Sequence, residues 1–188
     1  MPAQELNFLE QLLEKVEKKK ISPAIRLAYM GIILSLALIF SYVEALIPLP
    51  FAVPGMKLGL PNIVIVVVLY LFGPVPALCI NILRVVIVGI LFTNVYSLLF
   101  SLFGAAFSFA TMVLVQKVFH GSPVVTSVFG GLFHNTGQLA AAAIAVSTFQ
   151  IAYYLPVLLL AGFITGLIIG ILARLIIPRL KILLFKGE

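Results

Sequence analysis

The sequence has 188 residues, of which 63% are hydrophobic and 10% are charged, with a mean hydropathy of +1.25. A soluble domain is closer to half apolar and a quarter charged, so this composition excludes an ordinary water-soluble fold and indicates an integral membrane protein. The formal net charge of +6 is carried mainly at the chain ends. It forms no basic surface with polar or aromatic side chains that could contact bases, which argues against nucleic-acid binding.

Residues 1–21 predict a short amphipathic helix on the cytoplasmic membrane surface. Apolar residues recur at helical spacing, with Glu and Lys on the opposite side: Leu6, Leu9, Leu13 and Val16. Mixed charges and the long apolar run that follows distinguish this segment from a signal peptide. A solvated, partly frayed extension would show the same pattern.

The apolar remainder predicts six transmembrane helices, because a spanning helix needs about 20 mostly apolar residues. Proline and glycine mark most borders. The expected spans are residues 23–47, 60–72, 75–92, 95–119, 123–147 and 151–177, the last closed by Pro178. We therefore expect an all-α integral membrane bundle in one domain, residues 22–178, followed by a basic cytoplasmic tail, residues 179–188.

Lysine and arginine predict the orientation of the bundle. Nine of the twelve lie in the two terminal segments, and segments rich in these residues stay in the cytoplasm. Two cytoplasmic ends require an even number of crossings, which six satisfies. The predicted location is the cell membrane, with multiple passes.

Several catalytic and energising motifs are missing from the sequence. It has no glycine-rich phosphate loop, and Glu44 is the only acid between the terminal segments, so that no carboxylate cluster is expected to hold Mg²⁺. The single cysteine, Cys79, rules out an intrachain disulfide and a thiolate cluster. We expect a binding protein with no catalytic residues, no metal and no cofactor, which relies on partners for energy.

Arg84 lies near the middle of span 75–92, and Asn81 lies three residues earlier on the same face. A lone guanidinium at membrane depth is costly unless it faces protein, water or an opposite charge. One interpretation is a clamp for an anionic ligand, since arginine offers a planar fork of donors. The other is a structural ion pair with Glu44 or the capping of carbonyls between helices.

His134, Asn135 and Gln138 form a second polar cluster in span 123–147. Spacings of three and four place Gln138 on one face with both others. Polar groups at membrane depth should point inward. They either orient a ligand opposite Arg84 or hydrogen-bond between helices.

The connection FAVPGMKLGLPN, residues 51–62, is apolar for an exposed loop. We expect it to fold back over the bundle, so that Lys57 and Asn62 close a pocket from above. A plain hairpin connection with a snorkelling lysine is the alternative.

Two predicted spans carry faces of small residues that suit close helix packing. The first span holds the stripe Ala24, Ala28, Gly31 and Ser35. The sixth holds Gly162, Gly166 and Gly170. We expect the stripe, which begins at the cytoplasmic edge, to dock a partner, and the glycines to pack within the chain.

The expected protein resembles the substrate-binding S components of energy-coupling-factor (ECF) vitamin transporters. The shared features are a bundle of six helices with both ends inside, a small-residue stripe and no ATPase motif. Three motifs resemble more closely the Gx transporter family, often labelled heptaprenyl diphosphate synthase component I: GMKLGLPNIV at 55–64, the NxxR of Asn81–Arg84, and GxxHNxxQ at 131–138. The resemblance covers about residues 22–178.

This resemblance implies a small-molecule binder that delivers its substrate to a transmembrane coupling subunit driven by two ATPase subunits. It places the ligand toward the outer face, under the loop that joins the first helices. The matching site positions are Gly59, Asn62, Asn81, Arg84, Asn135 and Gln138. The AxxxA docking motif of S components would fall on Ala24 and Ala28. The name synthase does not fit the residues of the chain, because the sequence has no aspartate-rich Mg²⁺ site.

Three functions stay open at this point. The first is the ECF-type binding subunit, whose ligand is expected to be small, anionic and vitamin-like or isoprenoid-related, because Arg84, Lys57 and His134 outnumber Glu44. The second is an accessory membrane subunit of polyprenyl (heptaprenyl) diphosphate synthesis. The third is an autonomous ion-coupled carrier or channel.

Overall fold

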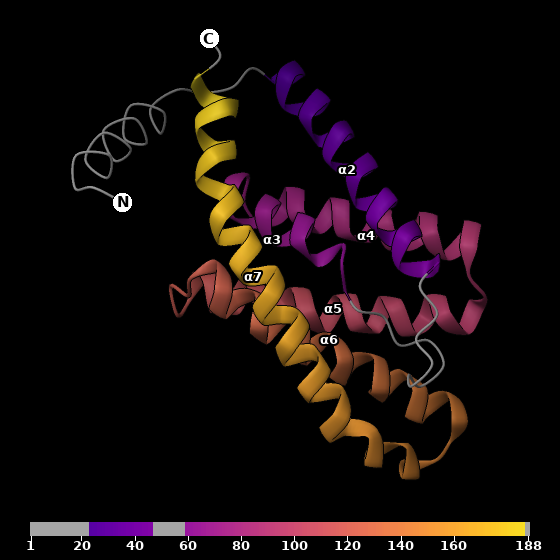
Figure 1. The fold of residues 1–188 in the computed structure, drawn as a ribbon. Coiled ribbons are helices and arrows are strands. Elements are labelled where there is room, and N and C mark those ends of the chain that lie inside the picture. Colours follow the sequence, from indigo (N-terminus) through magenta and orange to yellow (C-terminus); the bar gives the residue numbers. More distant parts are fainter. Residues whose placement is uncertain (1–22, 47–58, 187–188) are drawn as a thin grey trace.

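The computed structural model describes residues 23–46 and 59–186, and all regular structure in them is helical (Figure 1). The elements are α2 (Pro23–Leu46), α3 (Asn62–Leu71), α4 (Pro74–Phe92), α5 (Val95–Lys117), α6 (Pro123–Val146), the 3-10 helix η1 (Phe149–Tyr154) and α7 (Leu155–Lys186). These six α-helices correspond to the six expected segments, so the all-α prediction is confirmed. The predicted amphipathic helix, residues 1–21, lies outside the described residues.

Local sequence explains where the central helices begin. The side chain of Asn94 accepts a hydrogen bond from the amide of Ser97 and caps α5. Ser122 caps α6 in the same way, and Pro123 follows in the first turn, where its missing N–H costs nothing.

Within the described residues, four segments are long and apolar enough to cross a membrane: Pro23–Glu44, Pro74–Phe92, Val95–Lys117 and Gln150–Leu184. The chain is therefore a multi-pass membrane protein. α3 has only ten residues, about 15 Å of helix, or half of a hydrocarbon core of about 30 Å. α6 has 24 residues, but polar side chains interrupt its apolar run. Six crossings and two cytoplasmic ends stay predictions.

α5, α6 and α7 form the most closely packed part of the bundle. The glycines of α7 lie against α6: a Cβ on Gly166 would stand 2.8 Å from the carbonyl oxygen of Ser127, and a Cβ on Gly170 would stand 2.6 Å from the Cα of Val124. Such distances leave no room for a side chain, so the two backbones touch. The prediction that these glycines pack within the chain is confirmed.

α3 lies inside the bundle, and α2 lies at its edge (Figure 1). The run Val64–Leu69 is buried on all sides, as expected of a helix that is apolar all round. α2 is the least buried of the four candidate spans. Its buried residues are confined to its second half, at Ala37, Ser41 and Glu44.

The predicted end of the last helix at Pro178 is wrong. α7 continues through Pro178 to Lys186, so residues 179–186 of the predicted tail extend the helix. A proline removes one backbone donor but keeps a helical φ, and apolar neighbours on both sides sustain the pattern. Prolines in apolar helices are tolerated for this reason.

Candidate functional site

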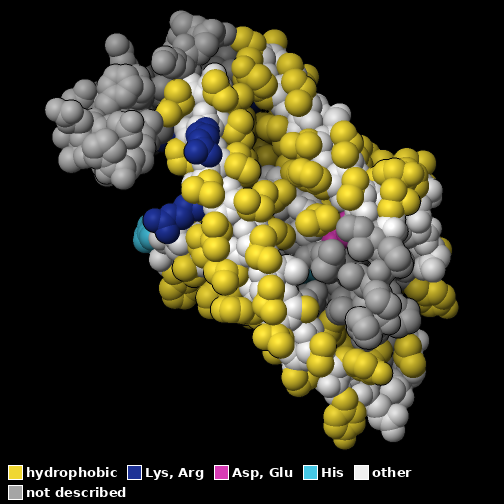
Figure 2. Space-filling model, viewed as in Figure 1, with side chains coloured by type: hydrophobic (Ala, Val, Ile, Leu, Met, Phe, Trp, Pro, Cys, Tyr) yellow, Lys and Arg dark blue, Asp and Glu magenta, His cyan; other side chains and the backbone are white. Residues whose placement is uncertain are grey.

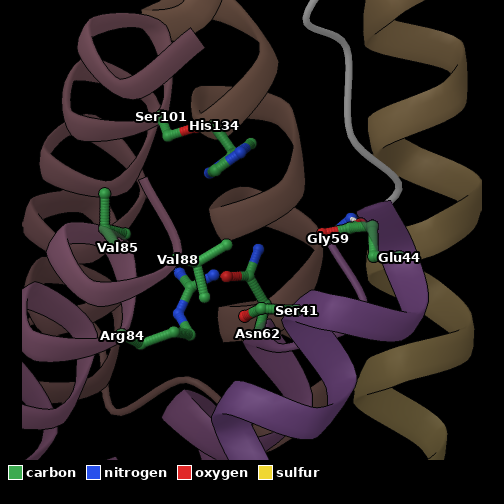
Figure 3. Close-up of a pocket in the computed structure, with 9 residues that line it drawn as sticks. All are labelled: Ser41, Glu44, Gly59, Asn62, Arg84, Val85, Val88, Ser101 and His134. Atoms are coloured by element: carbon green, nitrogen blue, oxygen red, sulfur yellow. Dashed lines mark hydrogen bonds between the residues drawn. The ribbon is translucent and has the colours of Figure 1, made fainter. Parts of the chain in front are cut away.

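A small polar cavity lies where α2, α3, α4, α5 and α6 meet (Figure 3). It is lined by side chains from all five helices and by the residue that precedes α3: Ser41, Glu44, Gly59, Asn62, Arg84, Val85, Val88, Ser101 and His134. Its volume is about 20 Å³, which is room for about one water molecule. We call it the central cavity.

A second hollow adjoins the central cavity on the side of α7. Asn62 and His134 line both, and Asn135 and Thr165 line only the second. Its volume is about 10 Å³. Asn62 and His134 therefore stand at the junction of a continuous polar region inside an apolar bundle.

Arg84 occupies the wall that α4 contributes to the central cavity. It lies close to the middle of the 19-residue helix and is only 6% exposed. Its Nη2 donates a hydrogen bond of 2.7 Å to Oδ1 of Asn81, while its Nε is buried without a hydrogen-bond partner. Figure 3 shows the guanidinium group pointing toward the side chain of Asn62. The expected pairing of Asn81 and Arg84 on one face is confirmed.

Glu44 closes the opposite side of the cavity by holding the chain that leads into α3. Its Oε1 accepts hydrogen bonds from the backbone amides of Gly59 and Leu60, the latter at 3.2 Å. Gly59 has a φ of +82°, a conformation that a side chain would strain. Glu44 and Arg84 line the same cavity. The two interpretations of Arg84, an anion clamp and a structural role, both stay predictions.

The polar cluster of α6 divides between different surroundings. His134 lines both polar hollows, whereas Nδ2 of Asn135 donates a hydrogen bond of 2.7 Å to the carbonyl oxygen of Leu158 and so ties α6 to α7. Gln138 lines neither hollow and packs against Gly104 of α5. Both polar atoms of its amide are buried without a hydrogen-bond partner.

The structure therefore gathers most, but not all, of the expected site residues. Those that line the two polar hollows are Glu44, Asn62, Arg84, His134 and Asn135. Asn81 reaches the site only through its hydrogen bond to Arg84, and Lys57 lies outside the described residues.

Sequence reasoning missed the small hydroxyl residues of the site. Ser41 and Ser101 line the central cavity, yet each also donates to a carbonyl one turn earlier, those of Ala37 and Ser97. Because a serine hydroxyl can donate to the carbonyl one turn earlier in any helix, the presence of a serine alone does not indicate a site. The available signal was spacing: Ser41 precedes Glu44 by three residues, on the same face.

The small-residue stripe lies away from this site. Ala24, Ala28, Gly31 and Ser35 are all exposed, and a Cβ added to Gly31 would meet nothing within 4 Å. The stripe is therefore exposed on the described bundle, and its docking role stays a prediction.

Comparison with known proteins places the chain in a family. A family model described as "Heptaprenyl diphosphate synthase component I" matches residues 33–176. No curated protein and no solved structure shows a significant match. The matched range includes every residue that lines the two polar hollows. The chain belongs to the heptaprenyl diphosphate synthase component I family.

Proposed function

We propose that this protein is the substrate-binding membrane subunit of an ECF-type transporter. It captures a small anionic molecule, vitamin-like or isoprenoid-related, at the outer face of the cell membrane. A transmembrane coupling subunit and two ATPase subunits then drive uptake, and the chain itself performs no catalysis. The observation that carries the proposal is a buried arginine, deep in an apolar bundle, that shares a cavity with polar side chains from four other helices.

The charges around the cavity favour an anion. Among the described residues, Arg84 is the only lysine or arginine that lines it, and its partner Asn81 is neutral. Glu44 already accepts two backbone hydrogen bonds, and Nε of Arg84 keeps a free donor. A carboxylate or phosphate group would accept from Nε and Nη2 together, in the bidentate geometry that arginine offers. Asn62 and His134 would then orient the remainder of the ligand.

The volume of the cavity indicates that binding requires movement. Small-molecule sites usually enclose about 300–1,000 Å³, whereas the central cavity holds about 20 Å³. The wall best able to move is α2, because it is the least buried candidate span and contributes Ser41 and Glu44. Displacing it would release the hydrogen bonds from Gly59 and Leu60 to Glu44 and open the cavity beside Arg84.

The exposed stripe on α2 supports a docking role for the same helix. Small residues let a second helix approach closely in a bilayer, and Ala24, Ala28 and Gly31 present such a surface. A ligand that moves the outer end of α2 would therefore also reposition the surface that meets the coupling subunit.

Native mass spectrometry of the gently purified protein tests the proposal directly. We expect a bound small anion and, in mild preparations, retained coupling and ATPase subunits. Liposomes that contain the chain with these partners should take up the ligand in an ATP-dependent manner. Uptake by the chain alone under an ion gradient would contradict the proposal in favour of an autonomous carrier.

The family description favours one second candidate, an accessory membrane subunit of polyprenyl diphosphate synthesis. In that case catalysis would reside on a soluble, carboxylate-rich chain that binds Mg²⁺. The candidate predicts prenyl-transfer activity that appears only when the two chains are mixed. A synthase chain that is fully active alone would remove it.

A further inference from the structure

A larger hollow lies between α4 and α5, at the surface of the bundle. We call it the α4–α5 crevice. Its volume is about 390 Å³, within the range of small-molecule sites. Most of its lining is apolar, and Leu78, Ile82, Phe103 and Phe107 are each exposed by about 40% or more.

One polar residue breaks this apolar lining. Asn81 is 3% exposed, and it lines the crevice while its Oδ1 accepts the hydrogen bond from Arg84. Val85 lines both the crevice and the central cavity. Asn81 and Val85 therefore lie between this apolar hollow and the buried guanidinium group.

We propose that the α4–α5 crevice holds the hydrocarbon tail of an amphipathic anion whose head group reaches Arg84 past Asn81. This inference rests on the proposed anion-binding function and narrows the ligand to one that enters from the bilayer. The tail stays in apolar surroundings throughout, so no water-exposed path is needed. At Arg84 the head group replaces the neutral amide of Asn81 with a stronger, charge-assisted hydrogen bond.

The shape of the crevice favours a chain over a protein partner. Along α4 it extends from Leu78 to Val85, about 10 Å at the helical rise. A docking helix is about 10–12 Å in diameter with its side chains and would need a longer, shallower groove. A flexible hydrocarbon chain fits a hollow of this size between two adjacent helices.

Photo-crosslinking in phosphatidylcholine nanodiscs tests this inference. The probe is dodecyl phosphate with a diazirine in the middle of its chain, and its matched control is the uncharged dodecanol with the same diazirine. We expect the phosphate probe to label peptides of α4 and α5 about tenfold more than the alcohol does, the ratio expected for one hydrogen bond to a charged group. Arg84→Gln should reduce labelling to the level of the alcohol.

Blocking the crevice provides the second readout. Ala106 lines it from an exposed position on α5, so Ala106→Phe should fill it and lower phosphate-probe labelling about tenfold by steric exclusion. Ala106→Leu is a milder version in case the first variant folds poorly. Ala110→Phe, one turn along the helix, exposed and outside the crevice lining, should leave labelling unchanged.

The outcomes separate this inference from the function on which it rests. Equal labelling by both probes, unaffected by Ala106→Phe, would show annular lipid contact only and overturn the inference. If a co-purified ligand were then lost in Arg84→Gln but kept in Ala106→Phe, the proposed function would stand. A ligand kept in Arg84→Gln together with equal labelling would overturn both.

Discussion

α7 and α2 are both long apolar helices, but the bundle holds them in different ways. α7 lies on α6 through three glycines that bring the backbones into contact: Gly162, Gly166 and Gly170. α2 is buried only in its second half and leaves its small-residue stripe exposed. The space-filling view shows hydrophobic side chains over most of the described surface on this face (Figure 2). The polar site thus has one closely packed wall, α7, and one less buried wall, α2.

The largest expected effect on stability comes from disrupting the close contact between α7 and α6. Gly166→Val would place a Cβ 2.8 Å from backbone atoms of both Ser127 and Val128, and neither backbone can yield. We expect a loss of about 3 kcal/mol or more in the free energy of unfolding, measured by thermal unfolding in detergent.

Gly31→Ala on α2 is the matched control for that substitution, since nothing lies within 4 Å of the added Cβ. Alanine is favoured over glycine in a helix by about 0.5–1 kcal/mol, so the variant should be as stable as the wild type or slightly more stable. Equal destabilisation by the two substitutions would contradict the claim that α7 is packed more closely against the bundle than α2.

The next prediction tests whether Glu44 holds α2 to the chain that leads into α3. Glu44→Ala removes the acceptor of the Gly59 and Leu60 amides and the negative charge beside Arg84, so we expect destabilisation of about 1–3 kcal/mol. It should also loosen α2, which a thiol probe at Ser41→Cys in a Cys79→Ala background would report as faster maleimide labelling.

Glu44→Gln retains an acceptor oxygen and removes only the charge. Its labelling at Ser41→Cys should therefore lie between those of the wild type and Glu44→Ala. If Glu44→Ala reacts no faster than the wild type, the carboxylate does not hold α2.

The smallest effect separates a structural from a ligand-binding role within α6. Asn135→Ala removes the hydrogen bond to the carbonyl of Leu158, which should cost about 0.6 kcal/mol, the average for such bonds in a membrane bundle. Ligand affinity should fall less than it does on substitution of His134, which lines both hollows. Ligand loss in Asn135→Ala as severe as in His134→Ala would assign Asn135 to the ligand itself.

The sequence predicted the helices well because apolar length and proline borders act locally. It also predicted that Arg84 and His134 would face one interior, since membrane-depth polar groups avoid lipid. It misjudged Pro178, where the apolar pattern on both sides outweighed a single lost hydrogen bond.

Residue spacing was less informative about which helices meet. It places Gln138 on one face with His134, yet Gln138 packs against Gly104 of α5 and lines neither polar hollow. Spacing likewise joins Asn81 to Arg84 but does not reveal that Asn81 lines an apolar crevice between α4 and α5. Which turn of one helix opposes which turn of another depends on glycine contacts made across the whole bundle.

The most direct test of the central claim is the affinity of the ligand identified by native mass spectrometry for three forms of the protein. Arg84→Gln should weaken binding about 30-fold or more, the cost of removing one partner of a buried charged pair. Arg174→Gln, at an exposed position of α7, should bind as the wild type does. Unchanged affinity in Arg84→Gln would contradict the claim that the buried guanidinium group binds an anion.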